Sequence, residues 1–166
     1  MPEVFVGAGS NFGPERALRR AGAELERRFG AVRYSRVYRS AAVGASAAPL
    51  GSPRADYLNL VVAFSTDRDA DSVHDELRAI ETLAGRTRID RAVCELDLDL
   101  LLYGASVDAA RRLPRPGLFT APFILGPLAE LAPTLVHPVT AERCGVAWQA
   151  AKHDALRDVG PFSALR

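Results

Sequence analysis

The sequence predicts an α+β fold in which helices pack on the faces of a mainly antiparallel sheet. Strand-like and helix-like segments follow one another in the order β-α-β-β-α-β-α, which is typical of that class. The connection over 44–55 suits an antiparallel pair of strands rather than a βαβ crossover. We interpret this small, Pro- and Gly-rich segment as a mobile loop. A length of 166 residues with 48% apolar content indicates one globular domain over 1–166.

The first half of the chain alternates strand and helix patterns. Residues 3–9 predict a short strand buried on both faces. Pro14 suits the first turn of a helix, and Gly30 is well placed to end it. Residues 31–38 alternate like a strand with one solvated face. The run 57–66 is almost entirely apolar, which indicates a central strand.

The next helix is expected to begin at Asp71 or Ser72 and to end at Gly85, because its apolar residues recur at helical spacing. Residues 95–103 then predict a strand. Three prolines in 113–122 favour a rigid extended segment.

The C-terminal part is expected to be helical. A helix over 123–132 would be stopped by the proline that follows it, and a last helix would cover 140–152. Residues 134–166 are therefore predicted to form a helical extension of the domain.

Charge and cysteine content disfavour several classes of protein. The 21 basic residues are balanced by 20 acidic ones, so no nucleic-acid partner is expected. Two cysteines without a CxxC motif do not fit a structural zinc site. No segment resembles a signal peptide or a membrane span. We therefore expect a cytoplasmic protein with reduced thiols and no membrane partner; a monomer is favoured.

The sharpest local signal is the Asp-x-Asp pair of Asp97 and Asp99. Because strand side chains alternate, both carboxylates point to one face, while Leu96, Leu98, Leu100 and Leu102 are expected to share the other. Two neighbouring carboxylates repel one another unless a cation lies between them. Mg²⁺ suits that position, since it takes one or two carboxylates and completes its shell with water and phosphates. The alternative is an edge strand with a charged outer face.

Two further groups of residues suggest chemistry. Arg86 and Arg88 precede this strand, and an arginine fork suits phosphate oxygens; alternatively, they cap the preceding helix. Tyr57 and Asn59 share one face of a strand expected to be buried. A polar heterocycle would satisfy the amide, and Tyr57 would form a pocket wall; alternatively, a neighbouring loop satisfies Asn59.

Taken together, these pieces resemble the 6-hydroxymethyl-7,8-dihydropterin pyrophosphokinase family over residues 4–133. Each piece is weak alone, but seven in a consistent order are specific. They are VGAGSNF at 6–12, SRVYRS at 35–40, DYLN at 56–59, IE at 80–81, GRTR at 85–88, LDLDLLLYG at 96–104 and FILGPLAELAP at 123–133.

The resemblance implies a ferredoxin-like three-layer sandwich and the transfer of pyrophosphate from MgATP to the hydroxymethyl oxygen of the pterin, which releases AMP in folate-type biosynthesis. It implies ATP as co-substrate and two Mg²⁺ ions. The metal ligands would be Asp97 and Asp99, and the catalytic residues Arg86, Arg88, Asp97 and Asp99. The pterin site would contain Asn11, Ser40, Val43, Tyr57, Asn59 and Phe123. The nucleotide site would contain Arg78, Glu81, Arg86, Arg88, Leu100, Arg112 and Arg115.

The chain departs from the family pattern at three positions. Cys94 stands where an arginine is usual, Arg115 replaces the histidine of a Pro-His-Pro segment, and Ala121 replaces another arginine. Losing one preorganised cation typically costs about 10²–10³ in rate. We therefore expect Arg91 or Arg115 to supply the missing charge.

Three hypotheses about function follow. The first is an active ATP-dependent pyrophosphokinase. The second is a homologue that binds pterin or nucleotide with weak or lost transfer activity. The third is an interaction or RNA-binding module, which the near-neutral charge disfavours.

Overall fold

The computed structural model describes residues 1–41, 56–86, 93–151 and 156–165. At its centre is a six-stranded sheet in which every pair is antiparallel. The strand order is β5-β1-β4-β3-β6, and the short β2 also pairs with β4. The strands are β1 (Glu3–Ser10), β2 (Arg33–Tyr34), β3 (Arg36–Ser40), β4 (Tyr57–Ser65), β5 (Asp97–Tyr103) and β6 (Leu156–Pro161).

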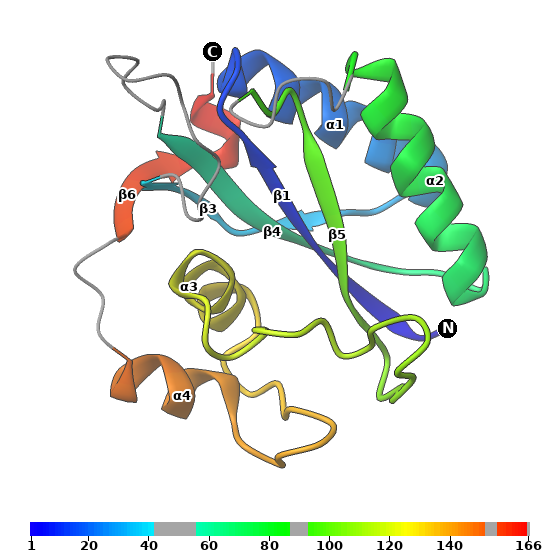
Figure 1. Ribbon diagram of the computed structural model, residues 1–166, viewed down its shortest axis with the longest axis vertical. Coiled ribbons are helices and arrows are strands. Elements are labelled where there is room, and N and C mark those ends of the chain that lie inside the picture. The colour runs from blue at the N-terminus through cyan, green and yellow to red at the C-terminus, as the bar shows by residue number, and fades with distance from the viewer. Residues whose placement is uncertain (42–55, 87–92, 152–155, 166) are drawn as a thin grey trace.

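Helices cover both faces of this sheet, as Figure 1 shows. Helices α1 and α2 lie on one face; α3 lies on the other, and α4 packs against α3. This arrangement confirms the predicted three-layer, ferredoxin-like α+β fold. The helices are α1 (Pro14–Phe29), α2 (Ala70–Leu83), α3 (Pro122–Leu131) and α4 (Cys144–Ala150), and a 3₁₀ turn spans Phe162–Ala164. None of the helices in the described ranges combines the length and apolar character that crossing a membrane needs.

Strand β4 is central because both of its faces are buried. Leu58, Leu60 and Val62 pack in the core beneath α1 and α2. Val61 and Ala63 pack in the second core, beneath α3. Each fully buried side chain of this kind contributes roughly 1.5–3 kcal/mol. The same alternation puts Tyr57 and Asn59 on the α3 face, where β4 approaches its N-terminal end.

Strand β5 lies at an edge of the sheet and contains a bulge. Leu96, Leu98 and Leu100 pack toward α1 and α2, as predicted. The pairing with β1 shifts between Phe5 and Val6, and Leu102 instead joins the core under α3. The expectation of four leucines on one face is therefore wrong at its last member, because an extra residue reverses the alternation.

The boundaries of α1 and α2 agree with the prediction except at the start of α2. Helix α1 has Pro14 at its first position and ends at Gly30, whose φ of 80° favours glycine. Helix α2 begins at Ala70 because Asp69 is its N-cap, accepting a 2.7 Å hydrogen bond from the backbone N–H of Ser72. The N-cap is thus Asp69 rather than the expected Asp71 or Ser72.

The proline-rich segment is not extended. Between 115 and 121 the backbone forms consecutive turns, in which the N–H groups of Leu118, Thr120 and Ala121 donate to carbonyls three or four residues earlier. Proline fixes φ without excluding turns, so prolines alone could not distinguish the two conformations.

Among the described residues of 134–166, the only α-helix is α4, which is shorter than the predicted 140–152 helix. Strand β6, which was not predicted, pairs with β3. Its residues are largely exposed, so it carries little apolar pattern. Within the described strands, it leaves β3 paired on both sides.

Candidate active site

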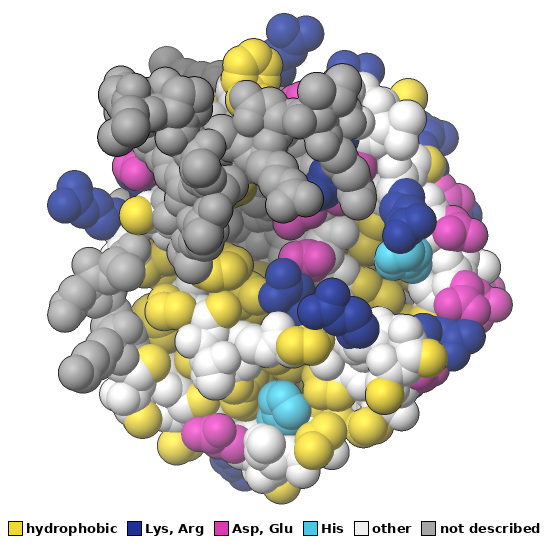
Figure 2. All heavy atoms as spheres, in the orientation of Figure 1, with side chains coloured by type: hydrophobic (Ala, Val, Ile, Leu, Met, Phe, Trp, Pro, Cys, Tyr) yellow, Lys and Arg dark blue, Asp and Glu magenta, His cyan; other side chains and the backbone are white. Residues whose placement is uncertain are grey.

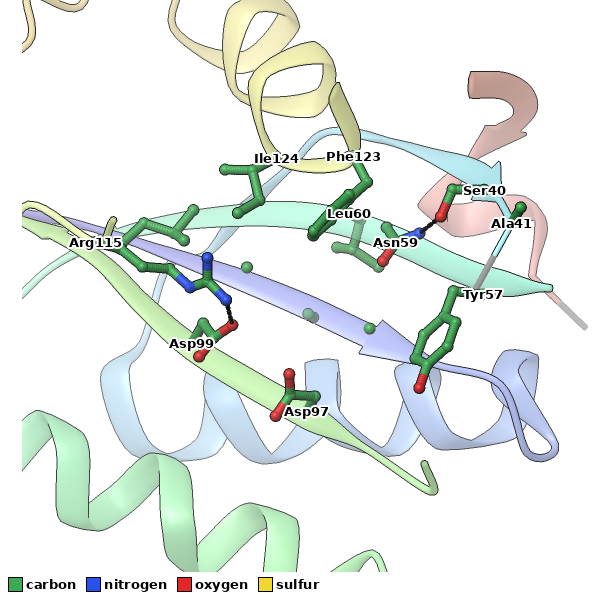
Figure 3. A pocket seen from close by; sticks show the side chains of 14 residues that line it. Ser40, Ala41, Tyr57, Asn59, Leu60, Asp97, Asp99, Arg115, Phe123 and Ile124 are labelled. Atoms are coloured by element: carbon green, nitrogen blue, oxygen red, sulfur yellow. Dashed lines mark hydrogen bonds and ion pairs between the residues drawn. The ribbon is translucent and has the colours of Figure 1, made fainter. Parts of the chain in front are cut away.

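A cavity of about 200 Å³ lies between the sheet and the beginning of α3 (Figure 3). Its floor is β1, and its walls come from β3, β4, β5 and α3. The lining residues are Gly7, Ala8, Gly9, Ser40, Ala41, Tyr57, Asn59, Leu60, Asp97, Asp99, Leu101, Arg115, Phe123 and Ile124. The cavity therefore brings together most of the predicted pterin-site residues and both aspartates.

Two glycines of β1, Gly7 and Gly9, leave space in the cavity because they have no side chain. A Cβ at Gly9 would lie 3.1 Å from Oδ1 of Asn59 and 3.8 Å from Cδ1 of Tyr57. A side chain there would occupy space beside the two polar residues. The sequence prediction treated this segment only as a buried strand and as one motif of the family resemblance, so the role of Gly9 in shaping the cavity was missed.

Asn59 is held by the neighbouring strand. Asn59 is only 7% exposed, and its Nδ2 donates a 3.0 Å hydrogen bond to Oγ of Ser40 on β3. Buried amides need such partners, and this one fixes the orientation of the amide at the cavity wall. The partner is thus a strand residue that itself lines the cavity, rather than a loop.

Two aromatic side chains stand on opposite sides of the cavity, Tyr57 on β4 and Phe123 on α3 (Figure 3). Burial, together with the neighbouring thiol of Cys94, raises the pKa of Tyr57 to about 12. Its phenol is therefore a neutral hydrogen-bond donor at physiological pH. Burial likewise raises the pKa of the Cys94 thiol to about 11, so Cys94 is not a reactive thiolate.

Asp97 and Asp99 point from β5 toward the cavity, although β5 is an edge strand. Each carboxylate has its own arginine. Nη2 of Arg115 lies 2.6 Å from Oδ2 of Asp99, and Arg86 pairs with Oδ1 of Asp97. Guanidinium groups therefore neutralise both carboxylates in this structure.

Arg86 is held by several acceptors at once. It pairs with the 5%-exposed Glu81 and with Asp97, and its Nη1 donates to the carbonyl of Leu96 at 3.1 Å. Glu81 also accepts a 2.9 Å hydrogen bond from the backbone N–H of Leu98. Arg86 thus follows the end of α2, as the capping alternative proposed, but its side chain is directed to β5.

A second, larger cavity of about 430 Å³ lies between α2, β5 and the turn at 110–115. It contains four of the predicted nucleotide-site residues, Arg78, Leu100, Arg112 and Arg115. Its other lining residues are Ala70, Asp71, His74, Leu98, Asp99, Ala110 and Arg111. Figure 2 shows basic side chains gathered beside acidic ones near the centre of this face.

The two cavities share Asp99 and Arg115. Arg78, Glu81 and Arg86 also line a small neighbouring hollow at the end of α2. The predicted pterin and nucleotide residues are therefore adjacent, with charged groups where the two sets meet.

Not every predicted residue lines one of the cavities described above. Oδ1 of Asn11 accepts a 2.7 Å hydrogen bond from the backbone N–H of Cys94, and Asn11 is absent from the cavity linings. Its contact fixes the segment before β5. Val43, Arg88 and Arg91 lie outside the described residues.

Arg111 was missed by the sequence prediction. It makes two 2.7 Å hydrogen bonds to the carboxylate of Asp71 and also pairs with Asp108. These contacts tie the turn to α2 and raise the pKa of Arg111. The only available signal was the Arg111-Arg112 dipeptide, from which the pairing with a residue 40 positions away could not be deduced.

Comparisons with known proteins point to one family of enzymes. The family model of 7,8-dihydro-6-hydroxymethylpterin-pyrophosphokinase (HPPK) matches residues 5–133. A 2-amino-4-hydroxy-6-hydroxymethyldihydropteridine pyrophosphokinase from Synechocystis is 38% identical over 148 residues, which cover 81% of this chain and 69% of that protein. The enzyme of the same name from Pseudomonas aeruginosa is 35% identical over 141 residues, covering 81% and 83% of the two chains.

Solved structures show the same fold. The Plasmodium falciparum HPPK-DHPS with pterin and p-hydroxybenzoate superimposes with a TM-score of 0.68 at 12% identity. The match covers 89% of this chain and 42% of that one, so this chain spans less than half of the larger protein. With the family model matched over most of its length, the chain belongs to the 7,8-dihydro-6-hydroxymethylpterin pyrophosphokinase family, whose members are ATP-dependent pyrophosphokinases of folate biosynthesis.

Proposed function

We propose that this chain transfers a pyrophosphoryl group from ATP to 6-hydroxymethyl-7,8-dihydropterin. The observation that carries the proposal is the meeting of two chemically different cavities at Asp99 and Arg115. One has aromatic and neutral polar walls, and the other is lined by arginines. A reaction that joins a heterocycle to a phosphate needs such a junction.

The smaller cavity suits the pterin. The oriented amide of Asn59 can read the donor and acceptor edge of a flat ring, and Tyr57 and Phe123 can pack on its faces. Ser40 contributes by holding the amide. The ring would then present its hydroxymethyl group toward the aspartates.

The larger cavity suits the triphosphate. Arg78, Arg112 and Arg115 line it, and arginine forks bind phosphate oxygens through paired hydrogen bonds. Such cations stabilise the charge that develops on a transferring phosphoryl group. Arg115 thereby supplies one positive charge where the two cavities meet. Cys94 and Ala121, which stand where the family pattern has arginines, supply none.

The carboxylate oxygens of Asp97 and Asp99 are suitable ligands for Mg²⁺. The described residues contain no group of three or more His, Cys, Asp or Glu side chains that could hold a metal ion. Mg²⁺ does not require one, because it typically takes one or two carboxylates together with water and substrate phosphates. We infer that these two residues hold the two Mg²⁺ ions of the substrate complex. When bound, Mg²⁺ would provide Lewis-acid stabilisation of phosphate charge.

In the proposed reaction, the hydroxymethyl oxygen of the pterin attacks the β-phosphorus of ATP. The bond between the β-phosphorus and the oxygen bridging it to the α-phosphorus breaks, and AMP leaves with that oxygen. The hydroxyl proton is released. The chain contributes positioning and charge stabilisation, which are the main sources of catalysis in phosphoryl transfer.

The test is incubation with MgATP and 6-hydroxymethyl-7,8-dihydropterin, followed by chromatography of the nucleotides. We expect AMP and the pterin pyrophosphate in equal amounts. Formation of ADP, or no nucleotide turnover, would contradict the proposal. Pterin binding without AMP would favour the alternative of a homologue that has lost transfer activity.

We also propose that residues 134–166 belong to the same domain as the family match. The support is structural, since α4 packs on α3 and β6 pairs with β3. The monomeric state and the cytoplasmic location expected from the sequence stay predictions. Sedimentation velocity at micromolar protein tests the first, and fractionation of cells tests the second.

A further inference from the structure

Arg115 is positioned by the backbone as well as by its charge. Its N–H donates a 2.9 Å hydrogen bond to the carbonyl of Leu101 on β5, which fixes the turn beside that strand. From there Nη2 reaches Oδ2 of Asp99 at 2.6 Å, while Nη1 donates to the carbonyl of Pro116. The guanidinium thus lies on the carboxylate at the boundary of the two cavities.

The contacts of Arg115 differ from those of Arg86. Arg86 also neutralises the buried Glu81, so its departure would leave a buried carboxylate without that cation. Within the described residues, Asp99 is the one carboxylate paired with Arg115. The side chains of Arg115 and Asp99 are 28% and 40% exposed, so their separation is opposed less by burial. Arg115 is therefore the more easily displaced of the two.

We propose that Arg115 couples metal binding to nucleotide binding. Without a divalent cation its guanidinium neutralises Asp99. When a cation binds Asp99, the guanidinium is displaced and becomes free to bind phosphate oxygens in the arginine-lined cavity. This inference rests on the proposed function, because it assigns Asp99 to the metal and the larger cavity to the nucleotide.

The proposal has two measurable consequences. A divalent cation alone must compete with Arg115, so it binds weakly. A nucleotide draws the guanidinium away and so raises the affinity for the cation. Linkage requires that the cation raises the affinity for the nucleotide by the same factor.

The experiment compares the wild type with Arg115→Gln. Mn²⁺ binding is followed by the electron paramagnetic resonance of the free ion, without nucleotide and with saturating α,β-methylene-ATP. Arg115→Gln should bind Mn²⁺ alone about three- to tenfold more tightly, because an ion pair of this kind no longer competes. The factor by which the nucleotide analogue strengthens Mn²⁺ binding should shrink accordingly.

Arg112→Gln is the matched control. Arg112 lines the same cavity three positions earlier and, among the described residues, pairs with neither aspartate. Arg112→Gln removes the same positive charge from the cavity but breaks no ion pair with Asp97 or Asp99. The rise in Mn²⁺ affinity should therefore be smaller than in Arg115→Gln. An equal rise in both variants would mean that the loss of any nearby positive charge strengthens Mn²⁺ binding, and it would overturn the proposal. An unchanged or weaker Mn²⁺ affinity in Arg115→Gln would also overturn it.

Arg115→Lys is a second, more conservative variant, which keeps the test interpretable if Arg115→Gln does not fold. It keeps a charge without the fork and should lie between the wild type and Arg115→Gln; thermal unfolding confirms that each variant is folded. If the wild type forms AMP while its Mn²⁺ affinity equals that of Arg115→Gln, the inference fails and the proposed function survives. If the wild type forms no AMP, the proposed function fails whatever the Mn²⁺ titration gives.

Discussion

The two cavities meet at one ion pair but are built differently. Tyr57, Asn59 and Gly9 of the smaller cavity belong to β4 and β1 in the interior of the sheet, where each strand is paired on both sides. The larger cavity is lined from α2, the edge strand β5 and the turn at 110–115. Under the proposed function, the first would therefore select its ligand by shape and neutral polar groups, and the second by charge.

This difference has a physical consequence for substitutions. In the smaller cavity a changed side chain leaves a buried polar group without a partner or fills space that the ligand needs. In the larger cavity the arginines are long and partly exposed, and solvent and salt screen their charges. Substitutions should therefore be costly and specific in one cavity, and modest and salt-dependent in the other.

The largest effect is expected at the junction. Asp99→Asn keeps the size of the side chain but removes the charge proposed to hold the metal where the two cavities meet, and Asp97→Asn does the same beside it. Each should lower the rate of AMP formation at least about 10²–10³-fold. The measurement is turnover at saturating MgATP and pterin.

Asp158→Asn is the control for these variants, because this carboxylate on β6 pairs with Arg36 away from both cavities. It should turn over like the wild type. Binding of a pterin analogue by Asp99→Asn, measured calorimetrically without ATP, should change little. If AMP formation persisted in either junction variant, its assignment to the metal would be wrong.

The second effect should be confined to the pterin. Asn59→Ala removes the amide held by Ser40, and we expect about 10- to 100-fold weaker binding of a pterin analogue. Ser40→Ala leaves the amide in place but unanchored, so its effect should be smaller. Affinity for α,β-methylene-ATP should be unchanged in both. Equal weakening of both ligands would contradict the separation of the two cavities.

The third effect tests how α3 is held over the smaller cavity. A Cβ at Gly126 would lie 2.7 Å from Cδ2 of Leu156 and 2.9 Å from Cη2 of Trp148. Gly→Ala in a helix ordinarily stabilises by about 1 kcal/mol. Here we expect Gly126→Ala to destabilise by about 1–3 kcal/mol in urea unfolding, because the core is overfilled. Since α3 carries Phe123, pterin affinity should fall with it.

Adding Leu156→Ala to Gly126→Ala should recover part of that loss, because it removes one of the two clashing side chains. Leu156→Ala alone should destabilise by creating space. The resulting coupling identifies a direct contact between α3 and β6. Additive effects would show that β6 does not restrain α3.

Sequence patterns were most reliable where one element determines the outcome. The apolar run of β4 and the spacing in α1 predicted both elements, since burial on two faces or one leaves a period in the sequence. The same alternation correctly put Asp97 and Asp99 on one face of β5. The assignment of residues to the pterin and nucleotide sites came from the order of the motifs that resemble the family, because no local pattern of apolar or polar residues identifies either site.

Contacts between distant elements could not be predicted. The bulge that moves Leu102 to the other face depends on the pairing of β5 with β1. Strand β6 depends on its backbone pairing with β3. The pairing of Arg111 with Asp71 joins a turn to a helix start. None of these leaves a local period or a capping residue, so each appears only when the chain is folded.

The smallest effect is expected at Arg112, and it tests the charged cavity by itself. Within the described residues Arg112 pairs with no carboxylate, so its charge is available to a ligand. Arg112→Gln should weaken α,β-methylene-ATP binding about threefold at low salt, in line with a partly exposed ion pair, and leave pterin affinity unchanged. Arg157→Gln, at an exposed position on β6, is the matched control and should bind the analogue normally. Because salt screens such a contact, the difference between Arg112→Gln and the wild type should shrink as ionic strength rises. A difference that persisted at high salt would mean that Arg112 acts through a buried, shape-determining contact, and the contrast between the two cavities would then fail on its charged side.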